Sequence, residues 1–546
     1  MKRASLSPEI VGGVLVAMVA GVLFFQDVGR YPFWDPDEAR HAEVAREMAS
    51  AHGIRRLLLP TLDLEPYHEK PAGYYWLVTL AYGVAGIGEA PARAISGAAG
   101  LAAVLMLYLY ALPRAGVAGA VATGLVAATS VGWFALARFA TLDMLFTACV
   151  TIGVLGGLDW LERPASPGPM LAPFIAAGIG TLVKGPLAVV LVGVPLALAV
   201  ATAHPRPPWR AFGLARGVAV TVAIAALLYV PVGILDPGYL SGFAETNLRR
   251  LGAGSPHAAP VYYYLLWLPV LFLPWTLVIP PALIRAVQDL RQRQRALLLW
   301  AAAVPTVLTL ARGKLATYVL SAIAPLALLV GPAVTEAWTT EDGDDDDWFR
   351  IVGWVAAGAL VTAGGGALLL DLILPVAPPG RALLTGAALG WAAVIAVVLQ
   401  RARPGLVPGL LLGACLTIYP LVVHFILPAV SALHSDRDAA RLVAASGPAP
   451  VVAFGGHAHS FGFYVGAPTI ETEDPELVRR LFARDDPVFL VTGESHFEAV
   501  EALLGPRAFL WHANPRRRLY GNHPRPVPEA PPEGEAPQPE PGNGSP

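Results

Sequence analysis

Residues 10–25 read Ile-Val-Gly-Gly-Val-Leu-Val-Ala-Met-Val-Ala-Gly-Val-Leu-Phe-Phe, an uninterrupted apolar run near the start of a chain of 546 residues. Similar runs of roughly 16 to 24 residues recur along the sequence, and about 20 residues suffice for a helix to cross a bilayer. The chain is 55% hydrophobic and only 14% charged, whereas soluble domains carry about 25% charged residues. The pattern predicts an all-α polytopic membrane protein and excludes a soluble globular one.

Thirteen of these apolar segments are predicted to be transmembrane helices. Basic residues in short loops mark the cytoplasmic side of a membrane. Lys2 and the arginine-containing loops at 204–216, 285–295 and 401–403 share that side only if residues 73–88 form a juxtamembrane helix that does not cross. The predicted spans are 10–27, 94–112, 116–137, 143–158, 170–184, 185–203, 217–235, 261–284, 296–311, 315–335, 351–370, 382–400 and 406–428.

Composition divides the chain into three parts. Residues 1–433 carry all the spans, and residues 28–93 form the first long outer loop. Residues 434–525 have the pattern of a small α/β domain outside the membrane. Residues 526–546 are rich in Pro, Glu and Gly, a composition that predicts disorder. In the α/β domain we predict strands at 448–454 and 487–492 and helices at 474–483 and 495–504.

Ionisable residues gather in the outer loops. The pair Asp37-Glu38 lies about ten residues past the first apolar run, and charged groups so close to lipid are usually functional. Lys184 is the only charged residue between two apolar runs. Further ionisable residues of the outer loops are Asp35, Arg40, Glu43, Arg46, Glu69, Lys70, Arg138, Asp143, Glu245, Arg249, Arg250, His257, Arg312 and Lys314.

Acids and bases on one face of a membrane suit chemistry on a lipid-linked phosphate. Lys and Arg side chains at helix ends would bind the phosphate. A carboxylate would take the proton of an acceptor hydroxyl. These two groups are what a transfer of a sugar from a polyprenyl phosphate requires.

Structural roles remain open for several of these residues. Asp37 and Glu38 also fit the N-terminus of a helix over 39–51, and Asp143 could cap its own helix. Lys184 could cap a helix C-terminus or extend to the membrane surface. The three histidines of the C-terminal domain are read as surface residues rather than a metal site, because neither cysteine nor a clear fourth ligand accompanies them. They are His457, His459 and His496.

Six motifs together resemble one family, the aminoarabinose transferases of bacterial lipid A. These enzymes belong with the protein O-mannosyltransferases to the GT-C class of integral membrane glycosyltransferases. The resemblance covers about residues 10–335, and the motifs occur in the family's order. They are Asp37–Glu43, Glu65–Pro71, Arg138–Asp143, Thr181–Gly185, Glu245–Arg250 and Gly313–Tyr318.

The resemblance implies an inverting transfer from an undecaprenyl-phosphate sugar, 4-amino-4-deoxy-L-arabinose or a related one, to lipid A or another envelope acceptor. The site would lie on the periplasmic face of the bacterial inner membrane, as would the C-terminal domain. The implied catalytic residues are Asp37 as general base with Glu38 and Arg40. The implied phosphate-binding residues are Lys70, Arg249, Arg250 and Lys314, and the substrate-orienting residues are Arg138, Asp143, Lys184, Glu69 and Glu245.

The sequence departs from the family at two places. Thr246 stands where some members have a histidine that holds a metal together with the equivalent of Glu69, so no metal or other cofactor is predicted. Ala72-Gly73 replaces Pro-Leu after Lys70-Pro71, which is expected to loosen the start of the next helix.

Two alternative functions stay open. A protein O-mannosyltransferase would share these motifs. A flippase for lipid-linked sugars would place charges near the membrane midplane in two related halves, and the spans here are nearly free of charge. The expected partners are the sugar donor, the acceptor and membrane lipids, with no nucleic acid.

Overall fold

The chain divides into two compact units, Met1–Arg437 with His459–Pro468, and Asp438–Ala458 with Thr469–Pro546. The computed structural model describes residues 7–162, 171–206, 212–249, 252, 255, 257–339, 346–372, 378–401, 403–505 and 508–525. The first unit is a bundle of helices and the second holds a small sheet. The predicted disordered tail, residues 526–546, lies outside the described residues.

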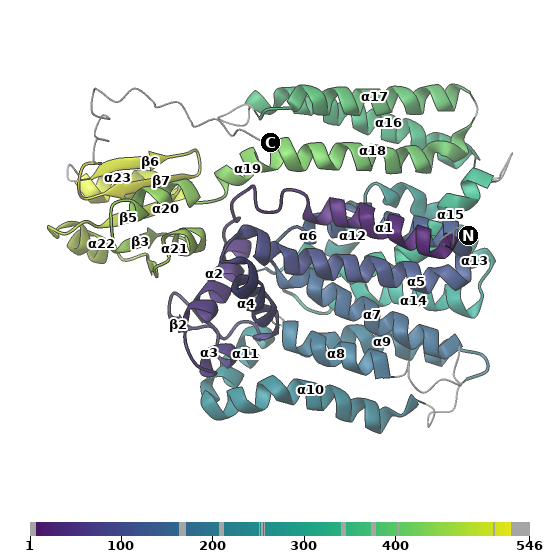
Figure 1. The fold of residues 1–546 in the computed structure, drawn as a ribbon, viewed down its shortest axis with the longest axis horizontal. Helices are drawn as coiled ribbons and strands as arrows, with labels where there is room; N and C mark the ends of the chain where they lie inside the picture. Colours follow the sequence, from purple (N-terminus) through teal and green to yellow (C-terminus); the bar gives the residue numbers. More distant parts are fainter. Residues whose placement is uncertain are drawn as a thin grey trace, which may run out of the picture. The chain divides into compact units, whose positions relative to one another are not determined.

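The long helices of the first unit run roughly parallel in Figure 1, and short elements gather at one end of this bundle. The long helices of its first half are α1 (Pro8–Phe25), α5 (Glu89–Thr129), α7 (Leu142–Glu162), α8 (Leu171–Lys184), α9 (Leu187–Thr202) and α10 (Leu214–Leu235). The short elements at that end are α2 (Asp37–Ser50), α3 (Arg55–Leu58), β1 (Thr61–Leu62), β2 (Glu65–Pro66), α4 (Gly73–Ala85) and α11 (Pro237–Arg249).

The bundle also contains further helices and short helical turns. They are α6 (Val131–Leu136), α12 (Tyr263–Leu271), η2 (Trp275–Val278), α13 (Ile279–Gln288), α14 (Gln292–Thr309), η3 (Ala316–Ala322), α15 (Ile323–Thr339), α16 (Asp346–Leu368), η4 (Leu369–Leu372), α17 (Arg381–Gln400), η5 (Pro404–Leu406), α18 (Val407–Leu421), the π-helical turn η6 (Val422–Ile426), α19 (Leu427–Leu433) and α21 (His459–Val465).

Helix α5 is two helices that meet at Gly116. This glycine has φ +67°, in the left-handed region that other residues rarely adopt. A Cβ placed on Gly124 would lie 3.6 Å from Cγ1 of Val104, although an unbroken helix would separate the two residues by about 30 Å. The two halves therefore form a hairpin, and the predicted boundary between spans 94–112 and 116–137 is confirmed.

Each of the thirteen predicted spans overlaps a helix, and the chain has the helical architecture of a membrane protein. By length and composition, eight described helices could cross a membrane, or nine if the bent pair α12 and η2–α13 is one span. The count of thirteen stays a prediction. Helix α4 has 13 residues and is about 20 Å long, shorter than the roughly 30 Å hydrocarbon core.

The loops predicted to share the cytoplasmic side do lie together. The Arg293 guanidinium donates to the carbonyl of Arg114 at 3.4 Å, and that of Arg295 donates to the carbonyl of Thr202 at 3.0 Å. Arg114 also forms an ion pair with Glu162 at 2.7 Å. These contacts join the turn at Arg114, the ends of α7 and α9 and the loop at 285–295, as the charge pattern requires. The side assigned to Lys2 and to the loop at 401–403 stays a prediction.

The second unit contains a five-stranded mixed sheet with strand order β4-β3-β5-β7-β6. Strands β3 and β5 are parallel and buried, and β7 runs antiparallel to β5. The elements are α20 (Arg437–Ala444), β3 (Val451–Phe454), β4 (Ile470–Thr472), α22 (Pro475–Phe482), β5 (Phe489–Gly493), η7 (Glu494–His496), α23 (Phe497–Leu504), β6 (Phe509–Ala513) and β7 (Arg517–Gly521). The two predicted strands correspond to β3 and β5, and the two predicted helices to α22 and α23.

One segment of the predicted C-terminal domain belongs to the helical unit instead. Phe463 of α21 packs edge-on against Phe33 with ring centroids 4.9 Å apart. The hydroxyl of Tyr464 accepts from the Phe33 amide and donates to Glu89. These contacts bind α21 to the first outer loop.

Gly73, at the start of α4, lies against the end of α8. A Cβ on Gly73 would lie 2.5 Å from the carbonyl oxygen of Leu182, closer than van der Waals contact allows. The glycine that was expected to loosen this helix start instead permits close packing of the outer loop on α8.

Two glycine substitutions in α4 should therefore have opposite effects. Gly73→Ala should lower the apparent melting temperature of the purified protein, because its Cβ meets a backbone atom. Gly83→Ala meets no atom within 4 Å and should stabilise the helix by up to about 1 kcal/mol. Thermal unfolding in detergent tests both, and equal shifts would contradict the packing assigned to Gly73.

Candidate active site

A buried ion pair fixes the first outer loop to the membrane bundle. Both carboxylate oxygens of Glu38 bind the Arg93 guanidinium, at 2.6 Å from Nε and 2.8 Å from a terminal nitrogen, and both side chains are fully buried. Glu38 also accepts from the backbone amides of Trp34 and Ala140, at 3.1 and 2.9 Å. All four acceptor positions of this carboxylate are thus occupied, which favours a structural role, and the predicted catalytic role of Glu38 stays a prediction.

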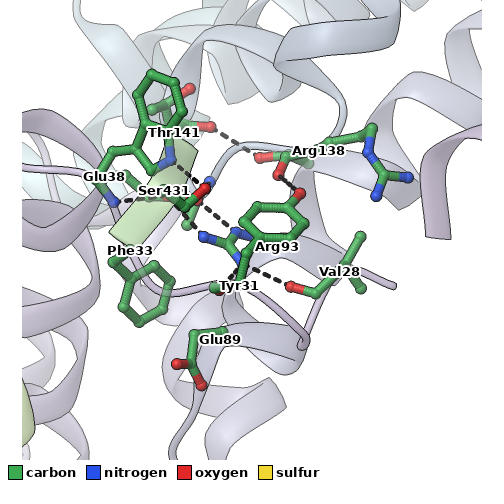
Figure 2. Close-up of polar contacts among 12 residues, drawn as sticks. Val28, Tyr31, Phe33, Glu38, Glu89, Arg93, Arg138, Thr141 and Ser431 are labelled. Atoms are coloured by element: carbon green, nitrogen blue, oxygen red, sulfur yellow. Dashed lines mark hydrogen bonds and ion pairs between the residues drawn. The ribbon is translucent and has the colours of Figure 1, made fainter. Parts of the chain in front are cut away.

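Arg93 organises the segment before α2. Its guanidinium donates to the carbonyls of Val28, Tyr31 and Pro32 at 2.6 to 3.0 Å and lies 3.9 Å from the centre of the Tyr31 ring. Figure 2 shows Arg93 between Glu38, Tyr31 and the Val28 carbonyl. One residue of α5 therefore fixes the path of residues 28–38, up to the first turn of α2.

Asp37 has the opposite environment to its neighbour. Successive residues of a helix point about 100° apart, so burial of Glu38 leaves the Asp37 side chain 64% exposed. Arg40 lies one turn further on and forms an ion pair with Asp37 at 2.5 Å and with Glu69 at 3.8 Å. The Arg40 guanidinium thus links the predicted base, Asp37, to Glu69, the residue next to Lys70.

The same cluster contains His41, which the sequence analysis did not single out. Burial holds the pKa of His41 well below its ordinary value, and the positive charges of Arg40, Lys70 and Lys184 lower it further. Its Nδ1 lies 2.9 Å from the Tyr75 hydroxyl. Burial and these charges favour the neutral form of His41, and predicted cations from the first loop and from α8 both act on it.

Asp143 and Lys184 form an ion pair between the start of α7 and the end of α8. Both side chains are largely buried, and the Lys184 ammonium lies 4.2 Å from the centre of the Tyr318 ring. Lys70 is also buried, and its carbonyl accepts from the Tyr239 hydroxyl at 2.9 Å. The ion pair joins two residues that the resemblance implied only separately.

Two other predicted residues are tied to backbone carbonyls instead. The Lys314 ammonium lies within 2.6 to 3.5 Å of the carbonyls of Ala259, Ala311 and Arg312. Arg138 is buried and donates to the carbonyls of Leu23 and Gln26. Three acceptors occupy the three ammonium hydrogens of Lys314, and Arg138 satisfies the open C-terminus of α1. These contacts favour structural roles, and the predicted phosphate-binding and orienting roles of the two residues stay predictions.

The third predicted group lies on α11. Glu245 and Arg249 form an exposed pair one helical turn apart, at 2.5 Å, so neither is joined to the cluster around His41 by a hydrogen bond or ion pair of the described residues. Arg250 lies outside the described residues, and its predicted contact with phosphate stays a prediction.

The histidines of the C-terminal region differ from the sequence interpretation in one case. His457 bonds Glu471 through Nδ1 at 2.9 Å, and the His496 ring packs edge-on against Phe454 in the same unit. His459 is buried in α21 and is not a surface residue. Glu69, whose equivalent holds a metal together with a histidine in some members of the family, forms an ion pair with Arg40.

Comparisons with known proteins bear on the family. A family model for dolichyl-phosphate-mannose-protein mannosyltransferases matches residues 69–234. The undecaprenyl phosphate-α-4-amino-4-deoxy-L-arabinose arabinosyl transferase of Pectobacterium carotovorum is 30% identical over 419 residues, which cover 73% of each chain. The chain belongs to this arabinosyl transferase family. The resemblance predicted from six motifs is confirmed.

A second sequence relative matches less of the chain, whereas a solved structure matches nearly all of it. Arabinosyl transferase 1 of Pseudomonas fluorescens is 30% identical over 345 residues, and the chain spans 59% of that relative's length. The crystal structure of ArnT from Cupriavidus metallidurans bound to undecaprenyl phosphate has the same fold, with a TM-score of 0.77, 22% identity and coverage of 93% of this chain and 98% of that one. The GT-C-like fold expected from the sequence is confirmed.

Sequence reasoning missed three residues that shape the site of this family member. Arg93 gave a signal, an arginine one position before the predicted span 94–112, that was not followed. His41 and Tyr239 gave none, because a histidine or tyrosine beside an acidic motif is common in any loop. Their roles depend on contacts with residues far away in the chain.

Loss of the Glu38 charge should destabilise the protein. Glu38→Gln leaves the Arg93 charge buried without its carboxylate, which costs about 3–5 kcal/mol for a broken buried pair. Glu245→Gln is the matched control, because its ion pair is exposed and contributes little. Thermal unfolding in detergent measures both. A Glu38→Gln variant that unfolds with the wild type would refute the structural role.

His41 should make stability depend on pH. Its pKa is lower in the folded protein than the value of about 6.5 of an unfolded chain, so the unfolded state takes up the proton first. The contribution of His41 to the free energy of unfolding is therefore present above about pH 6.5. It is lost as the pH falls below that value, by up to about 1.4 kcal/mol per pH unit. In His41→Gln the melting temperature should fall less between pH 7.5 and 5, whereas exposed His52→Gln should follow the wild type.

Proposed function

We propose that the chain is an integral membrane glycosyltransferase that moves a sugar from undecaprenyl phosphate to lipid A or another envelope acceptor. The site would lie on the periplasmic face of the inner membrane, and the donor sugar would be 4-amino-4-deoxy-L-arabinose or a related sugar. Membership of the arabinosyl transferase family supports both substrates. The observation that carries the proposal is the ion-pair chain from exposed Asp37 through Arg40 to Glu69, next to Lys70.

The residues divide the reaction between them. The Asp37 carboxylate takes the proton of the acceptor hydroxyl, whose oxygen then bonds to the anomeric carbon from the face opposite the phosphate. The bond from the anomeric carbon to the phosphate oxygen breaks, and its electron pair leaves with undecaprenyl phosphate. The configuration at that carbon is inverted.

Cations stabilise the departing phosphate. Lys70 is buried near His41 together with Arg40, and a charge held in a site of low dielectric acts more strongly than in water. Arg40 holds the Asp37 carboxylate in place, and its second ion pair, with Glu69, fixes Arg40 itself. Lys184 is neutralised by Asp143, so this pair supports the pocket wall and adds little net charge.

Two other functions remain to be tested. The match to the mannosyltransferase family model favours, as a second candidate, transfer of mannose from a polyprenyl phosphate to protein. A flippase would move lipid-linked sugar between two compartments, so transfer by the purified protein in detergent would distinguish an enzyme from it.

Asp37→Asn should lower transfer by a factor of about 10²–10⁴, the usual contribution of a general base, without changing the melting temperature. Asp438→Asn is the matched control, since Asp438 is an exposed carboxylate three residues before its own arginine, Arg441, at 3.9 Å. The assay is radiolabelled sugar transfer from undecaprenyl phosphate to lipid A by purified protein. Near-normal turnover of Asp37→Asn would exclude the proposed base.

A further inference from the structure

Helix α3 has two faces that line two different hollows of the first outer loop. Ile54, Leu57 and Leu58 line one hollow, and Arg55 and Arg56 line the other. Residues three and four apart share a helix face, so this short segment separates apolar side chains from basic ones.

The apolar hollow is a groove of about 640 Å³ between α3 and α4. Trp76, Leu80 and Val84 of α4 form its other wall, and the Trp76 indole donates to the Leu57 carbonyl, which holds the two helices together. Leu80 and Val84 are 65% and 82% exposed. Large exposed apolar surfaces of this kind bind another apolar molecule, and the volume lies within the range of ligand sites.

The second hollow, of about 320 Å³, is named the basic pocket after Arg55 and Arg56, which form no ion pair with the acids beside them among the described residues. Two acids line it, but Asp236 pairs with His68 at 3.0 Å and Glu47 accepts from Thr61 and Leu64. Arg56 donates only to carbonyls at the end of α2, and the Arg55 guanidinium makes no hydrogen bond or ion pair within the described part of the chain. Two arginine charges therefore face this pocket without an acidic partner among the described residues.

The basic pocket adjoins the candidate active site. Tyr239 lines the pocket, and its hydroxyl donates to the carbonyl of Lys70. His68, two residues before Lys70, lines it as well. An anion held by Arg55 would thus lie beside the lysine assigned to the donor phosphate, and it would be a second anion, because the donor carries only one phosphate.

We propose that the α3–α4 groove binds an acyl chain of the acceptor lipid and that Arg55 and Arg56 bind a phosphate of its headgroup. The pairing of an apolar groove with two arginines that form no ion pair among the described residues fits an anionic lipid, and the link to Lys70 through Tyr239 fits an acceptor. This inference rests on the proposed function, because it gives the acceptor of that reaction its place. Bulk bilayer lipid and the donor's polyprenyl tail are the competing occupants.

The first test fills the groove. Gly83 lines it and has no atom within 4 Å of a built Cβ, so the Cβ of Gly83→Phe meets open space beside the groove. Gly358→Phe is the matched control, because Gly358 of α16 also has open space around it. Binding of two probes to the purified full-length protein, bisphosphorylated lipid A and undecaprenyl phosphate, is measured in detergent, with thermal unfolding to confirm the fold.

The expected result is lipid A binding weakened about tenfold or more in Gly83→Phe, with undecaprenyl phosphate binding unchanged and the Gly358→Phe control like the wild type. Unchanged lipid A binding would mean that bulk lipid fills the groove, and weaker undecaprenyl phosphate binding would assign it to the donor. Either result overturns the proposal, as would a wild type that does not bind lipid A.

The second test concerns the phosphate. Arg55→Gln should weaken binding of bisphosphorylated lipid A by about tenfold or more, as for a lost hydrogen bond to a charged group, and Arg55→Lys should restore part of it. Binding of dephosphorylated lipid A should not change. Arg480→Gln, which removes an exposed arginine of α22, is the charge control, and equal losses in both variants would overturn the headgroup assignment.

These tests distinguish failure of the proposed lipid site from failure of the proposed function. A wild type that binds lipid A in the groove but transfers no sugar would refute the proposed function and keep the lipid site. A wild type that transfers sugar, with a Gly83→Phe variant of unchanged acceptor KM, would keep the function and refute the site.

Discussion

The buried pair of Glu38 and Arg93 is the interaction on which the site depends. Taking two charges out of water is costly, and it is tolerated only when every donor and acceptor finds a partner. Here the carboxylate receives two guanidinium and two amide hydrogen bonds, and the guanidinium also binds three carbonyls of residues 28–32. The loop before α2 is thereby held to α5 in a single arrangement, and the start of α2 with it.

The positions of the exposed charged residues follow from this buried ion pair. Because Glu38 points inward, the Asp37 side chain stays exposed, where Arg40 pairs with it and where, in the proposed reaction, a substrate hydroxyl would reach it. Arg40 then connects α2 to the segment of Glu69 and Lys70, and Gly73 lets the same segment pack against α8 near Lys184. Two neighbouring carboxylates thus serve different ends, one fixing the fold and one available for proton transfer.

The outer loop has a second function in the proposed scheme, since it carries both the proposed base and the proposed acceptor site. Its short helix α3 presents apolar residues to a groove and arginines to a pocket that reaches Lys70 through Tyr239. A lipid held there would bring its headgroup to the phosphate side of the reaction. Selection of the acceptor and its orientation would then depend on the same 50 or so residues, roughly the span of a small motif.

The sequence alone determined the helical membrane fold, the break near Gly116, the two main strands of the small domain and the family, because apolar run length, loop charge and short motifs are local properties. It also identified Asp37, Arg40, Asp143 and Lys184, since charge beside apolar segments is visible in the chain. Only the tertiary structure showed that Glu38, Arg138 and Lys314 form hydrogen bonds within the protein, that Arg93 organises the first loop, and that α21 belongs to the bundle. Those roles depend on which distant carbonyl or charge fills each hydrogen-bonding position, and a linear pattern does not contain that information.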